Sequence, residues 1–69
     1  GVKQSDRLAV EWWLKAAAAG DAIPQLRLGE AYEAGRGVTR DLTAARHWYR
    51  EAARRGHAAA QKALERLGR

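Results

Sequence analysis

The sequence repeats itself at an offset of 36 residues, and this repeat limits the possible folds more than any other feature. In this register Trp12 aligns with Trp48, and Gly20 aligns with Gly56. Self-similarity at a period of 20–50 residues is typical of solenoids that stack small structural units. We therefore expect one domain over residues 1–69 that consists of about two copies of one unit.

Composition and helix-end signals make each unit a pair of helices. Alanine, the best helix former, supplies half of the hydrophobic residues, and proline occurs once. Ser5, Asp21 and Asp41 are predicted N-caps, and Gly20 and Gly56 are predicted to end the preceding helices in the left-handed conformation. The sequence thus predicts an all-α fold, with helices near residues 6–19, 22–34, 41–55 and 58–67.

Aromatic residues recur at helical spacing beside small residues, which is the pattern of a closely packed core. An alternative is that the aromatic rings stack on nucleobases, but this requires exposed rings, whereas the register predicts buried ones. The predicted core consists of Trp12, Trp13, Leu28, Gly29, Tyr32, Ala45, Trp48, Tyr49 and Ala52.

The composition excludes several classes of function. Cysteine and methionine are absent and only two histidines occur, so we expect no disulfide, metal site or cofactor. A chain of 69 residues encloses too little volume for a typical enzyme pocket, and we expect no catalysis. The longest apolar run, Ala16–Ala19, is too short to insert across a membrane. The compartment is left open.

The net charge of +5 is concentrated in the second half of the chain. Arg46, Arg50 and Arg54 share one helix face, which is expected to be a solvated outer surface. The equivalent residues of the first copy are apolar: Val10, Leu14 and Ala18. We expect this apolar stripe to be an interface, covered by another chain or by a missing neighbouring helix.

Three segments resemble the Sel1-like repeat family. Residues 28–41 match its L-G-x-x-Y-x-x-G-x-G-V-x-x-D pattern, 45–53 its A-x-x-W-Y-x-x-A-A segment and 56–61 its G-H/D-A-x-A-Q segment. The related tetratricopeptide repeat also shares the L-G-x-x-Y signature. The resemblance implies a right-handed stack of antiparallel helical hairpins, in which 22–34 is a first helix and 41–55 a second helix.

The last helix departs from the family pattern. Glu65 and Gly68 stand where the pattern has glycine and tyrosine, so this helix is expected to be a terminal cap.

The resemblance also implies a non-catalytic protein–protein interaction module or scaffold that binds a peptide or protein through its concave helix layer. The residues that line this layer in the family-like register are Leu26, Arg27, Glu30, Glu33, Lys62 and Arg66. We expect an acidic end at Glu30 and Glu33 and a basic end at Lys62 and Arg66. An alternative is a basic helical module that binds nucleic acid or another polyanion through its Arg-rich second half, with steep salt dependence.

Overall fold

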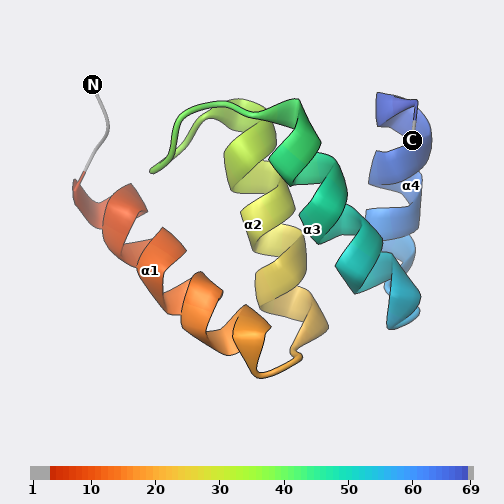
Figure 1. Cartoon of the computed structure of the whole chain (residues 1–69), viewed down its shortest axis with the longest axis horizontal. Coiled ribbons are helices and arrows are strands. Elements are labelled where there is room, and N and C mark those ends of the chain that lie inside the picture. Colours follow the sequence, from red (N-terminus) through yellow and green to blue (C-terminus); the bar gives the residue numbers. More distant parts are fainter. Residues whose placement is uncertain (1–3, 69) are drawn as a thin grey trace.

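The computed structural model describes residues 4–68, which form four helices in a row (Figure 1). The helices are α1 (Gln4–Ala18), α2 (Ala22–Ala34), α3 (Leu42–Arg54) and α4 (Ala58–Leu67). Each helix packs mainly against the next one in the chain. No strand occurs in this part of the protein. The all-α stack of hairpins is confirmed, and each helix begins and ends within two residues of the expected position.

The α1–α2 turn and the α3–α4 turn have the same geometry, as the repeat predicts. Gly20 and Gly56 adopt left-handed φ angles of 94° and 84°. Their N–H groups donate to the carbonyls of Ala17 and Ala53, and the N···O distance is 2.9 Å in both turns. The amide after each glycine donates to the carbonyl five residues back, at 3.4 and 3.2 Å. Both turns therefore satisfy helix-end carbonyls in the Schellman arrangement.

A glutamine ties each of these turns to the helix before it. The side-chain amide of Gln25 donates to the carbonyl of Ala17 at 3.3 Å, and that of Gln61 donates to the carbonyl of Ala53 at 3.5 Å. Each of these carbonyls is one of the last four of its helix. Such carbonyls have no hydrogen-bond partner within the helix. The 36-residue repeat thus extends from the sequence to its hydrogen bonds.

Two of the three predicted N-caps are confirmed. The side chains of Asp21 and Asp41 accept hydrogen bonds from the amides of Ile23 and Ala44, each at 3.1 Å. Ser5 is not an N-cap, because α1 begins one residue earlier and Ser5 lies within the helix. The prediction for Ser5 rested on its alignment with Asp41, which has extended φ and ψ angles of −153° and 104°, whereas Ser5 follows a residue that is already helical.

The buried core consists of two clusters that meet at α2. The cluster between α2, α3 and α4 contains Leu26, Ala45, Tyr49, Ala52, Ala60 and Ala63. The cluster between α1 and α2 contains Val10, Ala17, Leu28 and Ala31, with Trp13, Val38 and Trp48 packed against it. Because most of these residues are alanines, the helices approach closely and a few large side chains fill the space between them.

A very close contact joins Gly29 of α2 to Tyr49 of α3. A Cβ atom at Gly29 would lie 2.5 Å from a ring carbon of Tyr49. Tyr49 is 1% exposed and belongs to the packed cluster between α2, α3 and α4. Glycine in a helix interior costs about 1 kcal/mol relative to alanine, and here it allows the aromatic ring to lie directly on the helix backbone.

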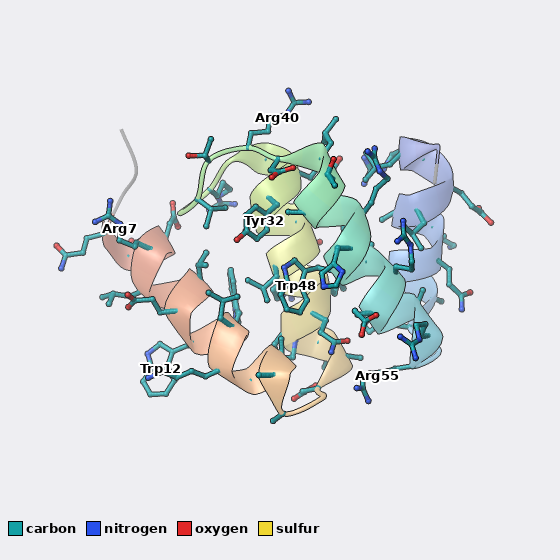
Figure 2. All side chains as sticks on the ribbon, in the orientation of Figure 1. Arg7, Trp12, Tyr32, Arg40, Trp48 and Arg55 are labelled. Carbon is teal, nitrogen blue, oxygen red and sulfur yellow. The ribbon has the colours of Figure 1, made fainter. Side chains whose placement is uncertain are left out.

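The three tryptophans do not share one environment. Trp13 and Trp48 are half-buried against the α1–α2 cluster. Trp12 is 70% exposed and points away from the rest of the protein (Figure 2). The expectation that Trp12 belongs to the core is therefore wrong. Its repeat equivalent, Trp48, lies against α1 and α2, whereas no described helix precedes α1 to cover Trp12.

The apolar stripe of α1 is divided between the core and the surface. Val10 is 4% exposed and packs within the α1–α2 cluster, so its assignment to an interface with another chain is wrong. Leu14 is 39% exposed, and Ala18 is also exposed. The stripe is split because it turns around α1, away from the side that faces α2.

We predict that Gly29→Ala destabilises the protein by up to about 2 kcal/mol, although alanine is the better helix former. The added methyl group overlaps the Tyr49 ring, and overpacking of this kind costs about 1–3 kcal/mol, which exceeds the gain in helix propensity. Urea unfolding followed by circular dichroism measures the difference. An unchanged or higher unfolding midpoint would contradict the prediction.

We predict opposite sensitivities for the two aligned tryptophans. Trp48→Ala removes a half-buried ring from the α1–α2 cluster and should cost about 2–3 kcal/mol, less than the 3–5 kcal/mol typical of a fully buried aromatic residue. Trp12→Ala should change the unfolding free energy by less than about 0.5 kcal/mol, as is usual for surface positions. Thermal unfolding of both variants tests this, and equal losses would contradict it.

Candidate binding groove

One face of the helix row carries a groove made of two adjoining hollows. The larger hollow has a volume of about 630 Å³ and is lined by Asp6, Trp13, Arg27, Glu30, Ala31, Glu33, Ala34, Arg36, Tyr49 and Arg66. The smaller one is lined by Leu26, Glu30, Tyr49, Ala59, Lys62, Ala63 and Arg66. Because the two share Glu30, Tyr49 and Arg66, they form one continuous surface that extends from α1 to α4. We call this surface the groove.

The structure brings all six residues of the predicted site to this groove. Arg27, Glu30, Lys62 and Arg66 are exposed there, and Glu33 is half-buried. Leu26 is 8% exposed and belongs to the cluster between α2, α3 and α4. Its side chain therefore lines the smaller hollow mostly from within the core, and its role as an apolar contact for a partner stays a prediction.

An ion pair joins the two helices that carry most of these residues. Both Nη atoms of Arg66 on α4 donate to the carboxylate of Glu33 on α2, and the Nη2–Oε1 distance is 3.0 Å. Bidentate pairs of this kind fix orientation as well as charge. Arg66 of α4 thus links this helix to α2, on the other side of α3.

The hydroxyl of Tyr49 makes a further hydrogen bond to the carboxylate of Glu33. It donates to Oε1 of Glu33 at 2.7 Å. The hydrogen bonds from Arg66 and then from Tyr49 stabilise the carboxylate and lower the pKa of Glu33 below its usual value of 4.5. Burial, together with the hydrogen bond to Glu33, raises the pKa of the Tyr49 hydroxyl. Glu33 is therefore ionised and Tyr49 neutral at physiological pH.

The groove lacks the expected separation into an acidic and a basic end. Arg66 pairs with Glu33, and Arg27 pairs with Glu30 at 3.0 Å on the same helix. Each acidic residue of the predicted acidic end therefore has a basic partner. Lys62 makes no ion pair with another residue of the 4–68 segment.

Several residues of the groove were not predicted as site residues from the sequence. Tyr49 was expected only in the core, and Trp13 likewise, but both also line the larger hollow. Asp6 and Arg36 were not considered, and they form a longer ion pair at 3.8 Å beside it. The alignment of Trp13 with Tyr49 was the available signal, because both rings stand at the same position of a second helix.

The basic stripe of α3 lies outside the groove. Arg50 and Arg54 are exposed, and Arg54 pairs with Glu51 at 3.0 Å. Arg46 is half-buried. None of the three lines either hollow of the groove.

The described residues contain no group of three or more acidic or histidine side chains that is placed to hold a metal ion. Within residues 4–68, no helix has the length and apolar character needed to cross a bilayer.

A row of antiparallel helical hairpins with a groove along one face defines the class of helical repeat proteins. A sequence model described as the Sel1 repeat matches residues 1–21 and 25–57. The chain belongs to the Sel1 repeat family. Such repeats are commonly protein–protein interaction modules, and proteins that contain them are generally non-enzymatic scaffolds.

A solved structure supports the same assignment. The Sel1 repeat protein from Oxalobacter formigenes is 41% identical to this chain, and the match covers 88% of this chain with a TM-score of 0.87. The chain spans about a quarter of the length of that protein. A comparison with curated proteins found no match.

We predict that Glu33 gives the protein a specific sensitivity to acid. A carboxylate whose pKa is lowered by folding stabilises the fold at pH values above its unfolded pKa. This contribution is lost as the pH falls through the lowered value. In Glu33→Gln the difference in melting temperature between pH 7 and pH 3 should therefore be smaller than in the wild type.

Glu30→Gln provides the matched control, since Glu30 is an exposed carboxylate paired within its own helix. Exposed pairs contribute little to stability, so this variant should keep most of the wild-type pH dependence. Equal pH dependence in the wild type and Glu33→Gln would contradict the prediction.

Proposed function

We propose that the protein is a non-catalytic binding module that holds a peptide or a segment of a protein partner in the groove. The observation that carries this proposal is the composition of the larger hollow. Trp13, Ala31 and Ala34 provide apolar surface, while Arg27, Glu30 and Arg66 surround it with exposed charges. Apolar surface with a few fixed polar groups is the usual character of a peptide-binding site.

The Tyr49–Glu33–Arg66 cluster supports this proposal by making the groove rigid. Arg66 is held by two hydrogen bonds and Glu33 by a third from a buried tyrosine. Side chains fixed in this way lose little entropy when a partner binds. Arg66 therefore presents its remaining donors in a defined orientation beside Lys62 of the same helix.

The charges of the groove are balanced rather than uniformly basic. Arg27 and Arg66 alternate with Glu30 and Glu33, which suits a segment with both acidic and basic side chains. A polyanion would instead require a continuous basic surface. The ion pairs within the groove therefore favour a mixed-charge peptide over nucleic acid.

We predict that charge reversal inside the groove weakens partner binding more than tenfold. The groove variant is Arg27→Glu with Lys62→Glu, which leaves the Glu33–Arg66 pair intact. Binding peptides are first selected from a displayed random library with the wild-type protein, and their affinities for each variant are then measured by calorimetry.

The matched control is Arg50→Glu with Arg54→Glu on α3. It makes the same change in net charge, and Arg54, like Arg27, has an i,i+3 glutamate partner at 3.0 Å. This outer variant should change the affinity less than threefold. If the outer variant abolishes binding, or if the affinity falls steeply with salt, the basic-surface alternative replaces the groove.

A further inference from the structure

The larger hollow of the groove combines small residues with one aromatic ring. Ala31 and Ala34 of α2 line it, and the half-buried ring of Trp13 lies on the α1 side. The volume of about 630 Å³ falls within the range of about 300–1,000 Å³ that is usual for pockets that enclose a ligand. The hollow therefore has room for a large apolar side chain of a partner, which would pack against the ring of Trp13.

The charges around this hollow cancel in pairs. The three ion pairs that line it are Arg27–Glu30, Arg36–Asp6 and Arg66–Glu33. Lys62, in the smaller hollow, is the remaining charged residue of the groove, and it has no ion pair within residues 4–68. With four basic and three acidic residues, the groove has a net charge of +1, which matches one carboxylate of a partner.

The ion pairs turn their arginines, more than their carboxylates, toward solvent. The side chain of Arg66 is 58% exposed and that of Glu33 is 23% exposed. Arg36 and Asp6 differ in the same way, with 72% and 30%. A guanidinium group has five N–H donors, and Glu33 occupies two of those of Arg66. The groove therefore offers a partner more hydrogen-bond donors than acceptors.

Lys62 and Arg66 together form a position for a carboxylate. They are four residues apart on α4, so their Cβ atoms are about 5–6 Å apart on one face of the helix. A carboxylate between them would accept hydrogen bonds from the free N–H groups of Arg66 and neutralise the charge of Lys62. Arg66 lines both hollows, so this position adjoins the apolar surface beside Trp13.

We propose that the groove binds a segment in which a large apolar residue and an aspartate or glutamate are two positions apart. The apolar side chain fills the larger hollow, and the carboxylate lies between Lys62 and Arg66. Two positions is the separation at which side chains of an extended segment point to the same side, about 7 Å apart. This inference rests on the proposed function and specifies which side chains of a mixed-charge segment are recognised.

The peptides that the wild-type protein selects from the displayed library test the pattern directly. They should be enriched in a large apolar residue two positions from an acidic one. The selected peptides are then synthesised with acetylated and amidated ends, so that all their carboxylates belong to side chains. Exchange of the apolar residue for alanine, or of the acidic one for its amide, should each weaken binding about tenfold in calorimetry, as expected for an anchor residue.

A variant that fills the larger hollow tests the apolar part of the proposal. Ala34 is exposed and is the last residue of α2, and leucine is nearly as good a helix former, so Ala34→Leu should keep the wild-type melting temperature. It should weaken binding of the selected peptides by about tenfold, because the added side chain occupies the space of their apolar anchor. The matched control is Ala18→Leu at the exposed last residue of α1, which lines neither hollow and should leave the affinity unchanged.

A second variant tests the carboxylate position through a double-mutant cycle. Lys62→Gln should weaken binding of an acidic peptide but not of its amide analogue, because the analogue has no charge for Lys62 to neutralise. Arg50→Gln removes the same charge from an exposed position outside the groove, and it should weaken neither peptide.

The outcomes separate this inference from the proposed function. Selected peptides that are weakened by Arg27→Glu with Lys62→Glu bind in the groove. If such peptides lack the pattern, or bind Ala34→Leu as tightly as Ala18→Leu, this inference is overturned and the proposed function stands. If no peptide is selected, or if the selected peptides bind the groove variant as tightly as the wild type, the proposed function is overturned as well.

Discussion

The contact between Gly29 and the ring of Tyr49 is the constraint on which the other features of the structure depend. It sets the separation of α2 and α3, and it fixes the direction in which the tyrosine hydroxyl points. That hydroxyl reaches Glu33, and Glu33 in turn holds Arg66 of α4. A missing side chain at one position thus determines the arrangement of three helices and of the charges in the groove.

The two copies of the repeat have the same backbone geometry but lie in different surroundings. Their turns have nearly identical hydrogen bonds, from the glycine amides to the glutamine side chains. The side chains that face outward have diverged: Leu14 of the first copy corresponds to Arg50 of the second. The conserved backbone geometry comes from local signals, whereas the surface of each copy reflects what lies beside it.

The sequence predicts the helices and turns well because their signals are local. Asp21 and Gly20 act on backbone groups two or three residues away, so their spacing is sufficient to place them. Trp12 shows the limit of this reasoning. The repeat identifies the face to which Trp12 belongs, but whether that face is covered depends on a neighbouring helix outside the pattern.

Six residues that line the groove were predicted from the sequence, but the pairing of their charges was not. The register identified the correct face of α2 and α4, and four of the six residues are exposed there. The pairing of Glu33 with Arg66 joins residues 33 positions apart. It depends on the distance between α2 and α4 across α3, which the alanines and Tyr49 set together. No periodic pattern in the sequence predicts the distance between α2 and α4.

The arrangement of the helices in chain order has a consequence for folding. Each helix packs mainly against its sequence neighbour, so nearly all contacts close short loops. Such topologies have low contact order and fold rapidly, on the microsecond to millisecond scale. Among residues 4–68, α1 packs mainly against α2, whereas α3 packs against both α2 and α4. We therefore expect the backbone amides of α1 to exchange with solvent through local opening that leaves the cluster between α2, α3 and α4 folded.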